Sequence, residues 1–311
     1  VAKHHPMLNV GIFGASGIGF VHARVFQSLG ANVTAILGTT KDSAAESASA
    51  LLTQQQIAAI PFSDIDLILE QPLDAVSICS PPSLHCQQLH ACFDRHLPVL
   101  CEKPLLWSND GGLKIADQLH SLKTHPNRQL FLNISNTVFI DSIQTRLHNP
   151  RVVSRFFFQF VTHGKYRGRD ILVDLLPHGL SLIHRLFGAR PIHDAKSEIS
   201  NNKAVLRFQY GNCDVQFSFE QDQRKAKRFY FEVDDQRYER IQTGFGNRYR
   251  VHLKDLGDNT NIEIEDPFRI CIKNFIDYCR TANSSRPDRF EEAEVNVQLM
   301  NEMLNMHVPP T

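Results

Sequence analysis

Two segments of the chain hold side chains that could move a proton or hold a reacting oxygen. Asp174 and His178 lie four positions apart in a helical pattern, so their carboxylate and imidazole fall on one helix face. An imidazole exchanges a proton near neutral pH, which suits general acid–base catalysis. Lys103 follows a predicted strand, where its ammonium could hold a substrate oxygen and stabilise developing alkoxide charge. The alternatives are a structural histidine on an amphipathic helix and a surface lysine.

A glycine-rich turn between the first predicted strand and the first predicted helix is typical of a dinucleotide site. The fingerprint Gly-x-Gly-x-x-Gly lets the backbone approach a pyrophosphate, whose charge then meets the helix N-terminus. Gly14 and Gly19 match its outer positions, Ser16 replaces the middle glycine, and Gly17 adds backbone freedom. A turn without a ligand is the alternative, but its place at the start of a βαβ unit favours dinucleotide binding. The predicted contacts are Gly14, Ser16, Gly17, Ile18 and Gly19.

The end of the second predicted strand indicates which dinucleotide binds. An NAD site usually has Asp or Glu there, which accepts hydrogen bonds from the ribose hydroxyls. This chain has Gly38, Thr39, Thr40 and Lys41 instead. Two hydroxyls and an ammonium would bind a 2′-phosphate, which a carboxylate would repel, so the segment favours NADP over NAD. The alternative is that Thr39 or Thr40 only caps the following helix.

Two further strand ends are predicted to face the nicotinamide. The segment 79–85 follows one strand, and Glu102-Lys103-Pro104 follows the next. In an open parallel sheet, the carboxyl ends of the strands line the ligand crevice. The predicted cofactor contacts in these two segments are Cys79, Pro81, Pro82, His85, Glu102 and Lys103.

These motifs, in this order, resemble the glucose–fructose oxidoreductase / inositol dehydrogenase (Gfo/Idh/MocA) family of sugar and polyol oxidoreductases. The resemblance extends over nearly the whole chain, from the glycine turn through Pro-Pro-x-x-His and Glu-Lys-Pro to the long strand and helix of the second half. It implies that Lys103 is the active-site lysine and that its bond to Pro104 is often cis. It also implies that Asp174 and His178, which match the family's Asp-x-Gly-x-His-x-x-Asp pattern, serve proton transfer and substrate binding. A homodimer or homotetramer is expected by the same resemblance.

Three positions depart from the family's pattern. Leu176 replaces a glycine, Ser181 stands where a second Asp is expected, and Asn133-Ile134-Ser135 replaces Asn-Tyr-Arg. These groups orient the histidine or touch the substrate, so the departures bear on the substrate more than on the reaction class.

The predicted function is hydride transfer between a nicotinamide and a carbinol or ketone carbon of a sugar, polyol or related hydroxy compound. In the oxidative direction, His178 would take the hydroxyl proton, Asp174 would orient it or bind a neighbouring hydroxyl, and Lys103 would polarise the reacting oxygen. Tyr166, in the basic loop 162–169, is a further predicted substrate contact. The cations of this loop either select a carboxylate or phosphate or are simply solvated. The alternative functions are a non-catalytic dinucleotide sensor and a reductase of imines or other unsaturated bonds.

The elements that must position these groups form an α/β protein. Short apolar runs alternate with amphipathic stretches up to about residue 127, which predicts a doubly wound parallel sheet of the Rossmann type over residues 1–127. Residues 128–311 predict an α+β domain with a mainly antiparallel open sheet, because period-two alternation dominates from residue 204. Its helix over 171–187 carries Asp174 and His178, with Pro177 expected in the first turn.

Composition excludes several other classes. The 33 Lys and Arg residues balance 33 Asp and Glu residues, so nucleic-acid binding is not expected. No apolar run approaches the roughly 18 residues of a membrane span. Seven cysteines without a Cys-x-x-Cys pair indicate reduced thiols and a cytoplasmic location. Neither a metal-ligand spacing nor a Gly-x-Ser-x-Gly elbow is present, so no metal site and no serine hydrolase are predicted.

Overall fold

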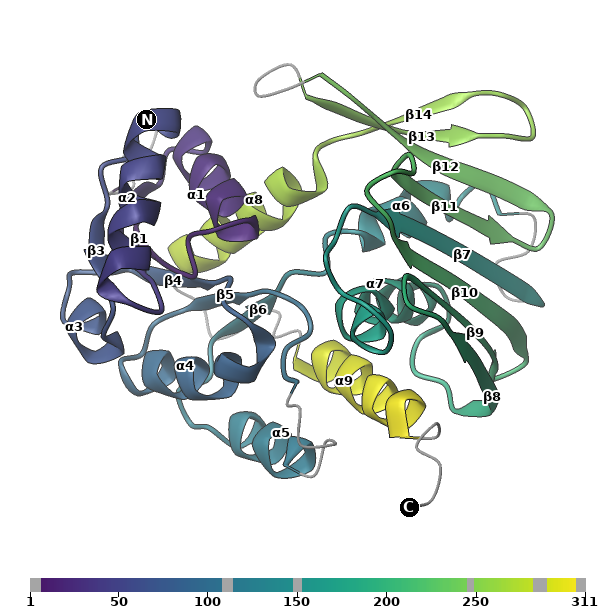
Figure 1. Ribbon diagram of the computed structural model, residues 1–311, viewed down its shortest axis with the longest axis horizontal. Helices are drawn as coiled ribbons and strands as arrows, with labels where there is room; N and C mark the ends of the chain where they lie inside the picture. The colour runs from purple at the N-terminus through teal and green to yellow at the C-terminus, as the bar shows by residue number, and fades with distance from the viewer. Residues whose placement is uncertain (1–6, 108–113, 148–152, 245–248, 282–289, 306–311) are drawn as a thin grey trace. The chain divides into compact units, whose positions relative to one another are not determined.

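The chain forms two compact units (Figure 1), one of residues 1–133 and 268–294 and the other of residues 134–267 and 295–311. The computed structural model describes residues 7–107, 114–147, 153–244, 249–281 and 290–305. The units differ from the predicted domains 1–127 and 128–311 in two ways. The first unit extends to residue 133 because it includes the last strand of the first sheet. It also includes residues 268–294, which follow the second sheet in sequence.

The first unit contains a parallel six-stranded sheet of order β3-β2-β1-β4-β5-β6, which confirms the predicted Rossmann architecture. Its strands are β1 (Asn9–Phe13), β2 (Asn32–Leu37), β3 (Ile60–Phe62), β4 (Ala75–Ile78), β5 (Val99–Cys101) and β6 (Leu130–Leu132). Its helices are α1 (Ile18–Ser28), α2 (Lys41–Gln55), α3 (Ile65–Leu69), α4 (Pro82–Asp94), α5 (Ile115–Lys123) and α8 (Pro267–Arg280). Because the strands are parallel, the segments that follow β1, β4 and β5 lie at the same carboxyl end of the sheet. The strand order reverses between β1 and β4, and in open α/β sheets ligands bind at such a point.

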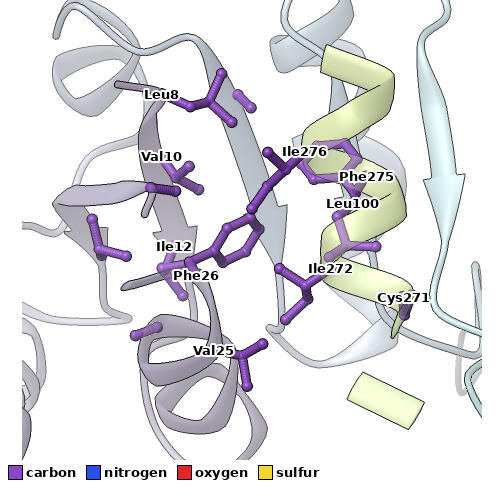
Figure 2. Close-up of a cluster of buried hydrophobic side chains, with 14 of the residues drawn as sticks. Leu8, Val10, Ile12, Val25, Phe26, Leu100, Cys271, Ile272, Phe275 and Ile276 are labelled. Atoms are coloured by element: carbon purple, nitrogen blue, oxygen red, sulfur yellow. The ribbon is translucent and has the colours of Figure 1, made fainter. Parts of the chain in front are cut away.

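Helix α8 completes the core of the first unit although it follows the whole second sheet in sequence. Figure 2 shows its apolar side chains against those of β1 and α1. The ring of Phe275 lies 6.2 Å from that of Phe26 and 6.0 Å from that of Phe131. A helix with one apolar face must bury that face somewhere, and here the Rossmann sheet covers it.

The second unit is built on an eight-stranded sheet of order β14-β13-β12-β11-β7-β10-β9-β8. Every neighbouring pair is antiparallel except β7 and β10, so the predicted mainly antiparallel sheet is confirmed. The strands are β7 (Arg155–Thr162), β8 (Ile192–Ile199), β9 (Lys203–Tyr210), β10 (Cys213–Gln221), β11 (Arg228–Val233), β12 (Gln236–Thr243), β13 (Arg250–Asp255) and β14 (Asn261–Ile264). The helices are α6 (Thr137–Ile143), α7 (Asp170–Phe187) and the second part of α9 (Phe290–Asn305).

Helix α7 packs against β7, β9 and β10. Gly179 permits the close approach, because a Cβ there would lie 2.7 Å from the ring of Phe217. Pro177 does not lie in the first turn as predicted. The helix begins at Asp170, so Pro177 occupies its interior, and Asn296 Nδ2 and Ser181 Oγ both donate hydrogen bonds to the Pro177 carbonyl.

The sequence patterns did not predict three of the observed elements. Strands β3 and β8 are edge strands with little buried surface, and β8 has one buried residue among its eight. Helix α6 is too short to show a clear helical period. The amphipathic pattern also predicts a helix over 108–122. It is observed from Ile115 onward, and residues 108–113 lie outside the described residues.

Candidate active site

The turn after β1 has the geometry of a phosphate-binding turn. Gly14 has a φ of +83°, and a Cβ there would lie 2.8 Å from the backbone nitrogen of Ser80. A Cβ on Gly19 would lie 2.0 Å from the carbonyl oxygen of Gly14, so only glycine fits this position. Gly17 has a φ of +54° and faces open space. The backbone nitrogen of Gly19 donates to the Ser16 carbonyl, while the Ser16 side chain is exposed.

The N-terminus of α1 fits an anionic group. Its first residue is Ile18, its N-cap is Gly17, no side chain of the described residues caps it, and its first turn contains no acidic residue. The N–H groups of the first turn other than that of Gly19, together with the positive end of the helix dipole, therefore face the glycine turn. This arrangement is the one that a pyrophosphate needs.

The segment after β2 forms contacts with helix α2 that the sequence did not indicate. Thr40 caps α2, because its hydroxyl accepts from the Ser43 backbone nitrogen at 3.1 Å and Ser43 Oγ accepts from the Thr40 nitrogen at 2.9 Å. Thr39 and Lys41 are exposed, but Asp42 in the first turn adds a carboxylate. Gly38 packs closely on this helix, since a Cβ there would lie 2.7 Å from the Ala44 nitrogen.

Pro81 and Pro82 begin α4 after the buried strand β4, with Pro81 at the N-cap and exposed. His85, in the first turn, is fully buried and faces backbone carbonyls on both sides. Its Nε2 lies 2.8 Å from the Ser80 oxygen, and its Nδ1 lies 3.1 Å from the Leu105 oxygen. Burial lowers the pKa of His85 against the raising effect of these hydrogen bonds. His85 thus joins α4 to the segment after Lys103 instead of presenting its ring to a cofactor.

A buried polar cluster joins β4, β5, β6 and α1. His22 Nε2 lies 2.9 Å from Glu102 Oε1, and His22 Nδ1 lies 2.9 Å from Ser77 Oγ. The Asn133 amide donates to the same carboxylate. Burial alone would lower the pKa of His22, but Cys79 and Glu102 outweigh it and raise the pKa to about 10. Burial would likewise raise the pKa of Glu102, but His22 outweighs it and lowers that pKa.

Glu102 therefore holds its charge inside the domain, where the sequence predicted a cofactor contact. Neither His22 nor the pairing was indicated by any motif. Cys79 lies at the edge of the same cluster, with its Sγ 3.4 Å from His22 Nδ1.

Lys103 follows directly on this anchored glutamate. It is half-buried, its backbone nitrogen lies 3.3 Å from Glu102 Oε2, and its bond to Pro104 is cis, as the family resemblance implied. Strand β5 and the cluster around Glu102 thus fix the backbone from which the Lys103 ammonium extends.

In the second unit, Asp174 is held by a buried glutamine that the sequence did not single out. Gln221 Nε2 donates to Asp174 Oδ2 at 2.7 Å, and Gln221 Oε1 accepts from the Tyr166 backbone nitrogen at 2.7 Å. Gln221 has no exposed surface. One amide therefore fixes both the carboxylate and the loop that carries Tyr166. Tyr166 is 44% exposed, and burial together with Asp174 raises the pKa of its phenol.

His178 is held by a second amide that the sequence missed. Asn136 Nδ2 donates to His178 Nδ1 at 2.8 Å, and the imidazole packs edge-on against Phe160, with the ring centres 5.2 Å apart. In this arrangement the proton of a neutral imidazole is on Nε2. Asn136 lies just before α6, four positions after the last strand of the Rossmann sheet, and no motif distinguishes it.

The side chains at the positions that depart from the family's pattern are buried or half-buried. Leu176 is fully buried, and Ser181 is 3% exposed. Ser181 Oγ donates to the Pro177 carbonyl at 2.7 Å and accepts from Asn296 Nδ2 at 3.1 Å. Ser135 is half-buried in the turn before α6.

In the basic loop 162–169, two arginines and a histidine lie against backbone carbonyls. Arg167 Nη1 donates to the Tyr166 carbonyl at 2.7 Å, and Arg169 donates to the Leu304 carbonyl. His163 Nε2 lies 2.8 Å from the Lys225 carbonyl. This geometry favours a loop stabilised by its own cations over one that presents them to a substrate.

The described part of the chain lacks two features. No group of three or more His, Cys, Asp or Glu side chains there could hold a metal ion. No helix there is long and apolar enough to cross a membrane.

Residues 8–124 match a family described as "Oxidoreductase family, NAD-binding Rossmann fold". Over 117 residues, the chain is 36% identical to an inositol 2-dehydrogenase from Streptomyces avermitilis. That alignment covers 36% of this chain and 32% of the relative, so the chain matches about a third of the relative's length.

Solved structures extend the likeness to the whole fold. A UDP-N-acetylglucosamine 3-dehydrogenase from Acidithiobacillus ferrooxidans superposes with a TM-score of 0.71 at 18% identity, covering 97% of this chain and 99% of the other. A 3-ketoreductase from Actinomadura kijaniata, in complex with TDP-benzene and NADP, superposes with a TM-score of 0.69 at 15% identity, covering 95% and 96%. At these identities the likeness concerns the fold alone.

Proposed function

We propose that this chain, whose residues 8–124 match the Gfo/Idh/MocA family of oxidoreductases, is an NAD(P)-dependent dehydrogenase or reductase of that family. The substrate is a sugar, polyol or related hydroxy compound that reacts at a carbinol or ketone carbon. The observation that carries the proposal is the turn from Gly14 to Gly19, where a Cβ on Gly19 would lie 2.0 Å from a backbone oxygen. Such a turn, followed by a helix N-terminus without a side-chain cap, suits a dinucleotide.

The nicotinamide, when bound, supplies or accepts the hydride. The backbone of the glycine turn and the first N–H groups of α1 hold the pyrophosphate. Lys103 polarises the reacting oxygen, and its ammonium stabilises negative charge that develops on that oxygen. The His22–Glu102 pair anchors the backbone before Lys103, which keeps the ammonium in place.

His178 exchanges the proton of the reacting oxygen through Nε2. With the Asn136 amide N–H donating to Nδ1, Nε2 carries a proton and donates a hydrogen bond to a ketone oxygen. A half-turn of this amide would present its oxygen instead, which supports a proton on Nδ1 and lets Nε2 accept the proton of a hydroxyl. Asp174, oriented by Gln221, binds a neighbouring hydroxyl of the substrate.

The preferred cofactor is NADP. Thr39 and Lys41 are exposed after β2, where a 2′-phosphate would lie in this fold, and no carboxylate ends the strand. Thr40 contributes to the helix cap, and the nearby Asp42 opposes a phosphate. The preference therefore depends on Lys41 and Thr39.

A fluorescence titration of the purified protein with NADPH and with NADH tests the first half of the proposal. Tighter binding of NADPH is expected. Tighter binding of NADH would retain the oxidoreductase and refute the phosphate argument, whereas failure to bind either dinucleotide would refute the proposal as a whole.

Turnover of a panel of sugars, polyols and ketones tests the second half. We expect Lys103→Ala and His178→Ala to abolish turnover while dinucleotide affinity is retained. Asn136→Leu should shift the pH profile of kcat/KM, because it removes the group that sets the His178 tautomer. Unchanged turnover in the Lys103 and His178 variants would refute their assignment. Tight dinucleotide binding without turnover of any compound would instead favour a sensor.

A further inference from the structure

An arginine of the second sheet lies over aromatic rings. Arg240, on β12, places its guanidinium carbon 4.6 Å from the ring centre of Phe229. The same carbon is 5.7 Å from the centre of Phe160 and 5.9 Å from that of Phe139. All three rings are buried, so the cation rests on an apolar surface that holds little water.

Among the residues that the structure describes, no carboxylate forms an ion pair or a hydrogen bond with Arg240. Two other arginines of the sheet do have such partners: Arg207 Nη1 lies 2.6 Å from Glu198 Oε1, and Arg228 Nε lies 3.0 Å from Glu239 Oε1. Burial lowers the pKa of Arg240 to about 10, with an opposing contribution from Tyr249. The guanidinium remains charged at neutral pH, and no described carboxylate pairs with it.

The strand register brings this cation to the same ring as the candidate catalytic histidine. Phe160 on β7 pairs with Phe229 on β11, and Arg240 lies beside Phe229 on the next strand, one step from the pair of Tyr230 and Glu239. The imidazole of His178 packs against the ring of Phe160 at 5.2 Å. Arg240 and His178 thus contact one phenylalanine, from a strand and from a helix.

We propose that Arg240 binds an oxyanion of the substrate, a carboxylate or a phosphate, near the carbon that reacts at His178. This inference rests on the proposed function and narrows it to acidic or phosphorylated sugars and polyols. A guanidinium binds either group through two parallel N–H bonds, and its weak hydration makes this possible on an apolar surface. An incoming oxyanion would also supply a counter-ion, which the described residues do not.

The opposite view is that Arg240 is a structural cation held by the rings. The two views differ in their consequence for ligand choice. A structural cation gives no preference between charged and neutral ligands of one shape, whereas a binding residue does.

Calorimetric titrations with D-glucuronate, D-glucose 6-phosphate and D-glucose, each with saturating NADP+, separate these views. We expect at least one of the two anions to bind about 10- to 100-fold more tightly than D-glucose, the range that charge-assisted hydrogen bonds give. The preferred anion identifies a carboxylate or a phosphate as the group recognised. Arg240→Met should abolish the preference, and Arg240→Lys should retain part of it because the charge remains without the fork.

Arg237→Met is the matched control, since Arg237 is exposed and lies on the opposite face of the same strand. It should leave the preference intact. Absence of an anion preference in the wild type, or its persistence in Arg240→Met, would overturn the inference. NADPH binding and turnover are measured separately, so an anion preference without turnover would refute the proposed reaction but not the role of Arg240.

Discussion

Replacing His22 by glutamine should remove a pH dependence of stability from the first unit. His22 is fully buried, pairs with Glu102 at 2.9 Å, and has a pKa raised to about 10. In the unfolded chain its pKa returns to about 6.5. The folded state therefore holds a proton that the unfolded state releases between these two values.

The magnitude follows from proton linkage. A group whose pKa is raised on folding stabilises the protein fully below its unfolded pKa, and that stabilisation is lost as the pH rises toward the folded pKa. The free energy of unfolding should fall by about 1.4 kcal/mol per pH unit in this window, or about 2 kcal/mol between pH 7.0 and 8.5. His22→Gln cannot bind the proton, so its stability should change little over the same range.

Urea unfolding at pH 7.0 and pH 8.5 measures the difference. The only tryptophan, Trp107, lies in the first unit, so its fluorescence follows the unfolding of that unit. His120→Gln is the control, because His120 is exposed and has no comparable burial. Equal pH dependence in the wild type and in His22→Gln would refute the charged His22–Glu102 pair.

Four further variants test the glycine turn, the helix cap and the amide that binds Asp174. Gly19→Ala should weaken NADPH binding at least tenfold by fluorescence titration, because its Cβ would lie 2.0 Å from the Gly14 oxygen and the turn must open. Gly17→Ala, which faces open space, should mainly lose about 1–3 kcal/mol of stability, because its φ of 54° and ψ of −110° lie outside the regions that L-residues favour. Thr40→Ala should destabilise the first unit by about 1 kcal/mol in urea, as lost caps do, without weakening NADPH binding. Gln221→Leu should raise the KM for substrate and leave dinucleotide affinity unchanged, since it removes the donor to Asp174; an unchanged KM would contradict that role.

The Rossmann half of the fold was predictable because its signals are local. The sequence predicts a strand over 32–37 and a helix that begins at Ile18, and β2 and α1 have these bounds. Buried parallel strands are continuous apolar runs, and the glycine turn marks the helix start. The place of α8 was not predictable. An amphipathic pattern shows that one face is buried but does not show which sheet covers it.

In the candidate site too, residues within short motifs were predictable, whereas partners distant in sequence were not. The positions of Lys103, Asp174 and His178 follow from short motifs. The groups that hold them do not, because Gln221 and Asn136 lie 47 and 42 positions away from Asp174 and His178. Only the folded chain brings such partners together, and the same holds for Arg240 beside Phe160.

Because α8 belongs to the first unit, the core of that unit cannot be completed until the ribosome has made this helix. Residues 134–267 are made after β6 and before this helix. At about 5–20 residues per second, the ribosome needs roughly 10–30 seconds to make them. Throughout that interval the apolar surface of β1 and α1 that receives Phe275 has no cover, so the nascent dinucleotide domain is a natural client for chaperones. A fragment that ends at residue 133 would keep this surface exposed permanently, and its expression would favour aggregation over folding.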